Sequence, residues 1–151
     1  MSACGGVAVA NPDSNLELSG IPSRVVVHQR SSPVVLVIDD NRDHVDLVRD
    51  QLGPQFCIVG ATDGLDGYSL ACAEPPGAIV LNVGMPVVDG WSVIRKLRSN
   101  PKTSEVPIMV VTGLDVEGVR PEAARFGVRA LLGKPYDATD LRRAVQKAVT
   151  R

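Results

Sequence analysis

Polar side chains follow four of the apolar, strand-length runs in this chain, and together they offer a defined chemistry. Asp39 and Asp40 follow the first of these runs, Asn82 the second, Thr112 the third and Lys134 the fourth. Two adjacent carboxylates suit a hard, oxygen-seeking cation such as Mg²⁺. A hydroxyl and an ammonium group opposite them suit the oxygens of a phosphoryl group. Since the carboxyl ends of parallel strands meet at one edge of a sheet, we expect these side chains on one rim.

Each of these residues has an ordinary structural explanation when it is taken alone. An acidic pair before a helix often caps that helix, a threonine at a strand end satisfies backbone groups, and a lysine before proline is commonly a solvated turn residue. The functional interpretation depends on their occurrence together. Gly113 adds to it, because a glycine after Thr112 leaves a backbone N–H that a ligand can approach.

Strand and helix patterns alternate five times after residue 33. Apolar runs rich in β-branched residues predict strands at 34–38, 56–59, 78–82, 108–111 and 130–132. Parallel neighbours require crossover helices, and these crossovers are right-handed. The alternation therefore predicts an α/β fold: a doubly wound, five-stranded parallel sheet in the flavodoxin-like order 2-1-3-4-5, with helices on both faces.

Apolar residues at helical spacing identify the inward faces of the helices between these strands. They are Val45, Val48 and Leu52 in the first helix, Leu65, Tyr68 and Ala71 or Cys72 in the second, Trp91, Ile94 and Leu97 in the third, and Leu141, Val145 and Ala148 in the last. Asp89 and Asp137 are the expected N-caps of the third and last helices. Gly118 and Pro121 interrupt the fourth helix, which we expect to begin near Pro121 and to be short.

Length and composition bound the remaining possibilities. The 151 residues fit one domain at 33–151, preceded by a flexible tail at 1–32 in which 24–27 offers a short edge strand. With 16 basic and 17 acidic residues, the net charge of −1 gives no electrostatic footprint for nucleic acid or an anionic membrane. No apolar run approaches the roughly 18 residues of a membrane span. The first residues lack the pattern of a secretory signal, so we expect a cytoplasmic protein.

Four segments resemble a known family when they are considered in order. They are VLVIDDN at 35–41, MPVVDG at 85–90, PIMVVTG at 107–113, and the stretch from Gly127 to Lys134-Pro135. Over roughly 33–151 the chain resembles the receiver domain of two-component response regulators. Each segment alone is a weak signal, whereas four of them in order at matching separations are highly specific.

The resemblance implies a role for each rim residue. Asp39 and Asp40 would hold Mg²⁺ with the main-chain carbonyl of Gly84, and the Lys134–Pro135 bond would be cis. The phosphoryl group would contact Thr112, Gly113 and Lys134.

Asn82 departs from the family, because it stands where receivers carry the phosphoaccepting aspartate. A carboxamide is neutral and far less nucleophilic than a carboxylate, so an acyl phosphate is not expected to form. The amide oxygen remains a weak metal ligand, but the loss of one negative charge predicts lower Mg²⁺ affinity.

Two further departures affect the expected switch. Leu131 replaces the Tyr or Phe that turns inward in receivers that switch, and the interrupted fourth helix lies on a face that many receivers use for partners. The sequence therefore favours a receiver fold without the usual phosphorylation.

The leading hypothesis is a stand-alone, non-enzymatic module that binds a protein partner, such as a sensor kinase or another signalling protein, through residues 121–151. The sequence also allows a homodimer. The alternative is a phosphorylatable receiver, in which Asn82 replaces a native Asp by engineering or a neighbouring carboxylate such as Asp39 or Asp40 accepts phosphate. An enzyme on the same fold, a Mg²⁺-dependent phosphohydrolase or a flavin protein, is the least favoured. His44 is expected on the surface of the first helix without a role in the site.

Overall fold

The computed structural model describes residues 32–84 and 89–150. Five parallel strands form one sheet in the order β2-β1-β3-β4-β5, as the sequence predicts. Their bounds are β1 Val34–Ile38, β2 Cys57–Ala61, β3 Ala78–Asn82, β4 Ile108–Thr112 and β5 Ala130–Gly133. The predicted tail at 1–32 lies outside the described residues except for residue 32, and its possible edge strand at 24–27 lies outside them as well. Residues 85–88 of the motif at 85–90 are also outside the described residues.

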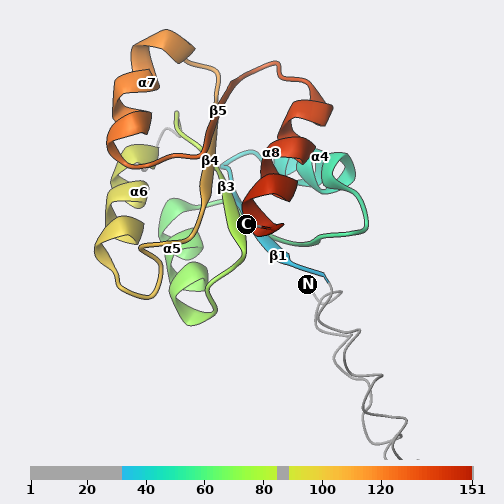
Figure 1. Cartoon of the computed structure of the whole chain (residues 1–151), viewed down its shortest axis with the longest axis horizontal. Helices are drawn as coiled ribbons and strands as arrows, with labels where there is room; N and C mark the ends of the chain where they lie inside the picture. The colour runs from blue at the N-terminus through green and yellow to red at the C-terminus, as the bar shows by residue number, and fades with distance from the viewer. Residues whose placement is uncertain (1–31, 85–88, 151) are drawn as a thin grey trace, which may run out of the picture.

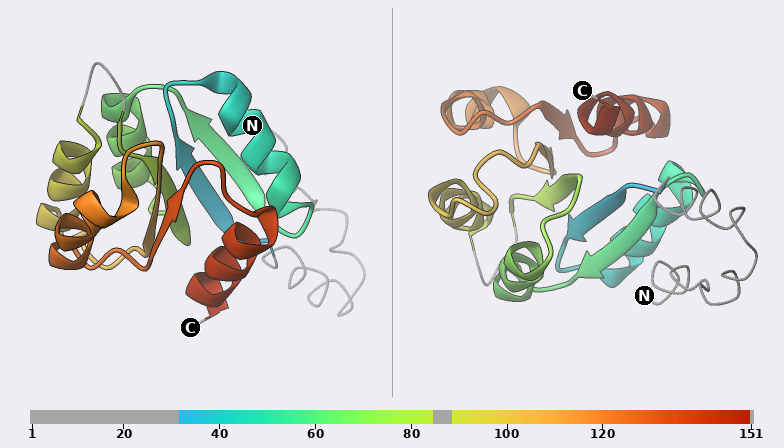
Figure 2. Two further views of the ribbon diagram at one scale, coloured as in Figure 1. Left: turned by 90° about the horizontal axis from the view of Figure 1, so that it is seen from above. Right: turned by 60° about the horizontal axis from the view of Figure 1, so that its bottom comes forward.

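Five helices cover the two faces of this sheet (Figure 1). Their bounds are α4 Arg42–Leu52, α5 Gly64–Ala73, α6 Gly90–Ser99, α7 Val116–Arg125 and α8 Ala138–Thr150. Helices α4 and α8 pack on one face, and α5, α6 and α7 lie on the other, so the sheet is the middle of three layers (Figure 2). This arrangement is a doubly wound α/β fold.

Alternation along the strands divides the core between the two faces. Val35 and Val37 of β1 pack with residues of α4 and α8, whereas Leu36 and Ile38 pack with residues of α5 and α6. All four side chains are buried. Full burial of such a side chain contributes roughly 1.5–3 kcal/mol, so both apolar layers hold the strand ends in place.

Side-chain caps fix where the helices begin beside the strand ends. The Asn41 side chain accepts a hydrogen bond from the Asp43 N–H at 2.9 Å, so α4 starts three residues after Asp39 without a frayed turn. Asp89 caps α6 in the same way, and the Asp137 side chain accepts from the Thr139 N–H at 2.8 Å. The two caps predicted from the sequence are therefore present.

The structure corrects two element boundaries. Strand β2 begins at Cys57 and extends to Ala61, because β1 pairs with it as far as Ile38 opposite Ala61. Helix α7 begins at Val116 and includes Pro121 in its interior, whereas the sequence predicted a start near Pro121. Pro121 removes one hydrogen-bond donor and crowds the preceding turn, yet the helix continues past it to Arg125.

The inward face of α5 also differs from the prediction. Leu65 is 52% exposed, and the inward positions are occupied by Gly64 and Gly67 beside the expected Ala71. A Cβ on Gly67 would lie 2.6 Å from Cδ1 of Ile38, so α5 sits too close to β1 for a side chain there. Glycine permits this close packing, and Leu65 consequently faces solvent.

Candidate functional site

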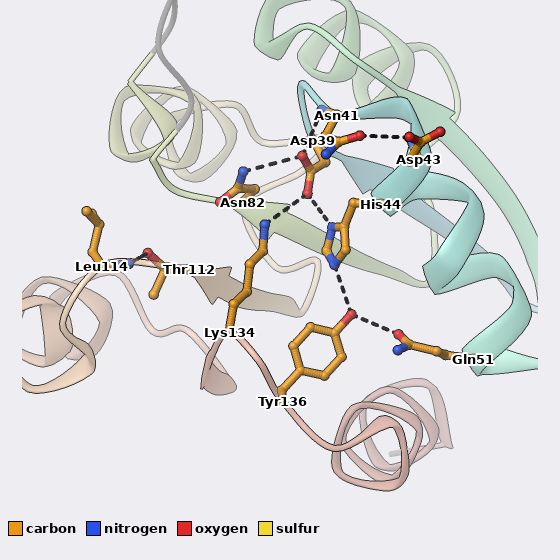
Figure 3. Close-up of polar contacts among 10 residues, drawn as sticks. All are labelled: Asp39, Asn41, Asp43, His44, Gln51, Asn82, Thr112, Leu114, Lys134 and Tyr136. Atoms are coloured by element: carbon orange, nitrogen blue, oxygen red, sulfur yellow. Dashed lines mark hydrogen bonds and ion pairs between the residues drawn. The ribbon is translucent and has the colours of Figure 1, made fainter.

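Asp39 is the centre of a polar cluster at the carboxyl end of β1 (Figure 3). Its side chain is 2% exposed. The Oδ1 atom accepts hydrogen bonds from the Asn41 N–H at 2.9 Å and from Asn82 Nδ2 at 3.4 Å. The Oδ2 atom contacts His44 Nδ1 and lies 3.6 Å from Lys134 Nζ. Both carboxylate oxygens are thus engaged by donors of this chain.

The ionised form of Asp39 is favoured despite its burial. Burial raises the pKa of this carboxyl, but the hydrogen bonds from His44 and the Asn41 N–H, with the charge of Lys134, outweigh it and hold the pKa below its usual value. Asp39 therefore carries a buried negative charge that its neighbours stabilise.

Asn82 lies beside Asp39 because β1 and β3 are adjacent and in register, with Ile38 opposite Leu81. Its side chain is 8% exposed, and its amide donates to Asp39 Oδ1. A carboxylate at this position has no hydrogen to donate and would repel Asp39. The amide thus suits a pocket in which Asp39 is already ionised.

The β4 end of the rim is less connected than the β1 end. Thr112 is fully buried, and its hydroxyl oxygen accepts a hydrogen bond from the Leu114 N–H at 2.9 Å within its own loop. The Lys134 N–H donates a hydrogen bond to the Thr112 carbonyl at 2.7 Å. This backbone hydrogen bond connects the end of β4 to Lys134, which directly follows β5. Gly113 is exposed, and a Cβ there would meet no atom within 4 Å. The Lys134–Pro135 peptide bond is cis, as expected.

Leu131 packs away from the charged cluster. It is partly buried among the apolar residues on the α5 and α6 side of the sheet. Trp91, expected inward, is partly buried in the same layer and stacks on Phe126 with ring centroids 6.4 Å apart. Leu131 thus fills an apolar position, without a ring or hydroxyl that would reach the rim.

The predicted metal donors differ in exposure, because Asp39 and Asn82 are buried. Asp40 is exposed, as is Gly84, which adopts a φ of 141°. Within residues 32–84 and 89–150, no three side chains of His, Cys, Asp or Glu are grouped to hold a metal ion. Carboxylate, amide and carbonyl oxygens suit Mg²⁺ by type, but the charge of Asp39 is already offset by Lys134. The donors fit a hard cation in chemistry, and an ion at Asp39 would compete with the contacts from Lys134 and His44.

His44 belongs to this site, and the sequence prediction that it lies on the surface without a role there is wrong. Its side chain is 12% exposed, and its Nε2 atom lies 3.0 Å from the Tyr136 hydroxyl. The signal was in the sequence, because His44, Val48 and Gln51 share one side of α4 at spacings of four and three residues. What the sequence did not give is that Tyr136, far along the chain, meets this side.

Tyr136 joins the cluster to the α4 helix. Its hydroxyl donates to Gln51 Oε1 at 2.8 Å. Burial raises the pKa of the Tyr136 phenol to about 12, with a contribution from the negative charge of Asp39. The phenol therefore stays neutral and acts as a hydrogen-bonding bridge.

Comparison with known proteins identifies the family. The model of the response regulator receiver domain matches residues 35–146, so the chain belongs to this family. It is similar to the protein PilH of Pseudomonas aeruginosa, with 30% identity over 114 residues that span 74% of this chain and 93% of PilH. It is also similar to the response regulator PleD of Caulobacter vibrioides, with 36% identity over 104 residues, 68% of this chain. The chain spans only 23% of PleD.

A solved structure agrees in fold. The receiver domain of the sensor histidine kinase PA1611 from Pseudomonas aeruginosa superimposes with a TM-score of 0.69, over 80% of this chain and 99% of that domain, at 24% identity. This likeness shows the shared fold, and the family match shows that this protein carries a receiver domain of two-component signalling. Among the described residues, no helix combines the length and apolar character that crossing a membrane requires.

Proposed function

We propose that this receiver is a phosphorylation-independent protein-binding module of two-component signalling, with no enzymatic role. The observation that carries the proposal is Asn82, whose amide donates to Asp39 at the end of β3. A phosphoryl group is accepted by an oxygen nucleophile, and a neutral carboxamide is a poor one. Asn82 occupies the phosphoacceptor position. The pocket would therefore retain the residues that contact a phosphoryl group, Thr112, Gly113 and Lys134, but would lack the carboxylate oxygen that bonds to phosphorus.

The β4 and β5 residues support the same proposal. A phosphorylation switch needs Thr112 to move toward the phosphoryl group and a ring to follow it. The Thr112 hydroxyl instead accepts from the Leu114 N–H, and Leu131 has no ring. We therefore expect the partner-binding face to be formed in one permanent arrangement.

Magnesium binding is proposed to be weak. The PA1611 receiver domain is described with magnesium coordinated in its active-site cleft. In this chain the residues that would hold the ion are Asp39, Asp40, Asn82 through its amide oxygen, and Gly84 through its carbonyl. The bound ion would supply positive charge to phosphoryl oxygens. Asn82 removes one of the negative charges that would attract it.

The proposed partner face is the surface within residues 121–151. Residues 32–84 contain eight acidic and two basic side chains, whereas 89–150 contain seven acidic and eleven basic ones. The net charge of −1 therefore combines a net negative segment at 32–84 with a net positive segment at 89–150. A groove of about 360 Å³ lies on the net positive segment, with a floor of Ala144 and Ala148. Its charged lining consists of Arg129, Arg143, Lys147 and Asp140.

Three cations around an apolar floor fit an acidic segment of a signalling partner, such as a sensor kinase in the cytoplasm. Charge reversal of Arg143 with Lys147 is expected to abolish capture of a cognate kinase, whereas reversal of Arg120, exposed on α7 outside the groove, is expected to preserve it. Equal capture by both variants would contradict the assigned face. Sedimentation of the chain alone tests whether a second copy occupies the groove instead.

Phosphorylation is tested by intact-mass spectrometry. The chain and its Asn82→Asp variant are incubated with Mg²⁺ and a small phosphodonor such as acetyl phosphate. We expect one added phosphoryl group on the variant and none on the parent chain.

A phosphorylatable receiver is the second candidate function. It is favoured by one observation, the retention of Asp39, Thr112 and Lys134 at neighbouring strand ends. In this case phosphate is accepted by a neighbouring carboxylate such as Asp39 or Asp40, or Asn82 replaces a native aspartate. A phosphoryl group on Asp39 or Asp40 of the parent chain would establish phosphorylation of a neighbouring carboxylate. The genomic codon for position 82 would decide whether Asn82 replaces a native aspartate.

A further inference from the structure

A continuous chain of polar contacts leads from the rim to the seam between α4 and α8 (Figure 3). It begins at Asp39 Oδ2, which contacts His44 Nδ1. On the other side of the ring, His44 Nε2 lies 3.0 Å from the Tyr136 oxygen, which is in turn 2.8 Å from Gln51 Oε1. Arg142 of α8 continues it by donating from Nε to the Gln51 carbonyl at 3.2 Å.

The direction of the first contact follows from chemistry. An ionised carboxylate only accepts hydrogen bonds, so the hydrogen between Asp39 and His44 belongs to Nδ1 of the ring. Lys134 Nζ lies 3.6 Å from the same oxygen as an ion pair, and the other oxygen accepts hydrogen bonds from the Asn41 N–H and the Asn82 amide, so both oxygens of Asp39 are already engaged. A cation that binds Asp39 must therefore displace a donor or share an oxygen with it.

We propose that His44 is a positioning residue that takes the place of a cation at Asp39 and, through Tyr136, fastens the rim to the α4–α8 seam. The pocket then keeps its arrangement without a bound metal. A hydrogen bond to a charged group is strong in a buried setting, and it opposes metal binding by the free energy that it contributes. This goes beyond the proposed function, because Asn82 blocks phosphorylation whether or not His44 holds Asp39.

Magnesium affinity of the full chain tests the first half of the proposal. In the Asn82→Asp background, where binding is strong enough to measure, Mg²⁺ is titrated and amide chemical shifts are followed by NMR. We expect His44→Leu to bind Mg²⁺ about tenfold more tightly, the factor expected from the loss of one charged hydrogen bond. His44→Asn offers an amide donor near the position of Nδ1, and we expect it to keep the lower affinity.

Two results would overturn this half. One is equal affinity in His44→Leu and its Asn82→Asp parent. The other is an equal gain in His44→Leu and His44→Asn, which would assign the effect to ring volume and not to the donor. Thermal melts establish that each variant is folded. The mass measurement on Asn82 is independent of His44, so failure here leaves the proposed function standing and is distinguishable from its failure.

Tyr136→Phe tests the connection to the seam, with Tyr68→Phe as the matched control. Tyr68 is also half-buried, and its hydroxyl accepts from Asn100 at 3.1 Å on the opposite face of the sheet. We expect Tyr136→Phe to speed hydrogen exchange at the end of α4 and the start of α8 about tenfold, while the Mg²⁺ affinity in the same background changes little. Exchange at the seam that is the same in both tyrosine variants would show that Tyr136 does not fasten it.

Discussion

The two ends of the rim are built differently, although both lie at carboxyl ends of strands in one sheet. At the β1 end, Asp39 is contacted by donors from four other residues, and its charge is balanced by Lys134. At the β4 end, within the described residues, the Thr112 side chain bonds only to its own loop, and a Cβ on Gly113 would meet no atom within 4 Å. The pocket is therefore stabilised around one buried charge, and within the described residues the Thr112 side chain makes no hydrogen bond to that charge.

The largest expected difference between the two ends is in folding stability. Asp39→Ala leaves His44, Lys134 and a backbone N–H without their acceptor, and it is expected to lower the free energy of unfolding by about 3 kcal/mol. Thr112→Val removes one hydrogen bond to Leu114 and is expected to cost about 1 kcal/mol. Urea unfolding at pH 7 measures both, and equal losses would remove the distinction between the ends.

Glycine substitution tests the packing behind each end. Gly67→Ala places a Cβ 2.6 Å from the fully buried Ile38 and is expected to cost about 2 kcal/mol by overpacking. Gly113→Ala, after Thr112, meets no atom within 4 Å and is expected to change stability by less than about 0.5 kcal/mol. A tolerated alanine at position 67 would mean that α5 moves freely over β1.

A negative charge at position 82 is expected to change how the β1 end of the rim responds to Mg²⁺. Asn82→Asp sets a second carboxylate beside Asp39, so a cation that binds this variant stabilises it by linkage. At a Mg²⁺ concentration ten times its Kd, the gain is about 1.4 kcal/mol. Calorimetric melts with and without Mg²⁺ are expected to show a raised Tm for the variant and little change for the parent chain. An equal rise in both proteins would contradict the role given to Asn82.

The smallest effect concerns Tyr136 at high pH. Its pKa is raised to about 12 from the usual 10, so the folded chain retains a proton that the unfolded chain loses between these values. Stability from this group is therefore complete below pH 10 and decreases as the pH rises from 10 toward 12. Phenolate absorbance of a Tyr68→Phe variant, which leaves Tyr136 as the only tyrosine, measures the shift. Half-ionisation near pH 10 would contradict it.

The sequence was sufficient for the fold because local patterns agreed with one another. Strand-length apolar runs, helix caps at Asp89 and Asp137, and one recurring order of elements all indicated the same sheet. Parallel topology then placed Asp39, Asn82 and Lys134 together, since strand ends in such a sheet share an edge.

The remaining features depend on contacts between distant segments. The spacing of Leu65 predicts an inward position, but the close approach of Gly67 to Ile38 decides which side of α5 faces the sheet. The sequence predicts a surface position for His44, because a polar residue beside an apolar stripe is normally solvated. Only the fold shows that Asp39 and Tyr136 reach it from opposite sides.

Amide spectra test directly whether this pocket responds to a phosphoryl group. Beryllofluoride bonds to a carboxylate as a phosphoryl mimic, so amide spectra of the parent chain and of Asn82→Asp are compared before and after its addition with Mg²⁺. We expect resonances around Asn82, Thr112 and Lys134 to stay in place in the parent chain and to shift in the variant. Shifts in the parent chain at the same positions would contradict this expectation.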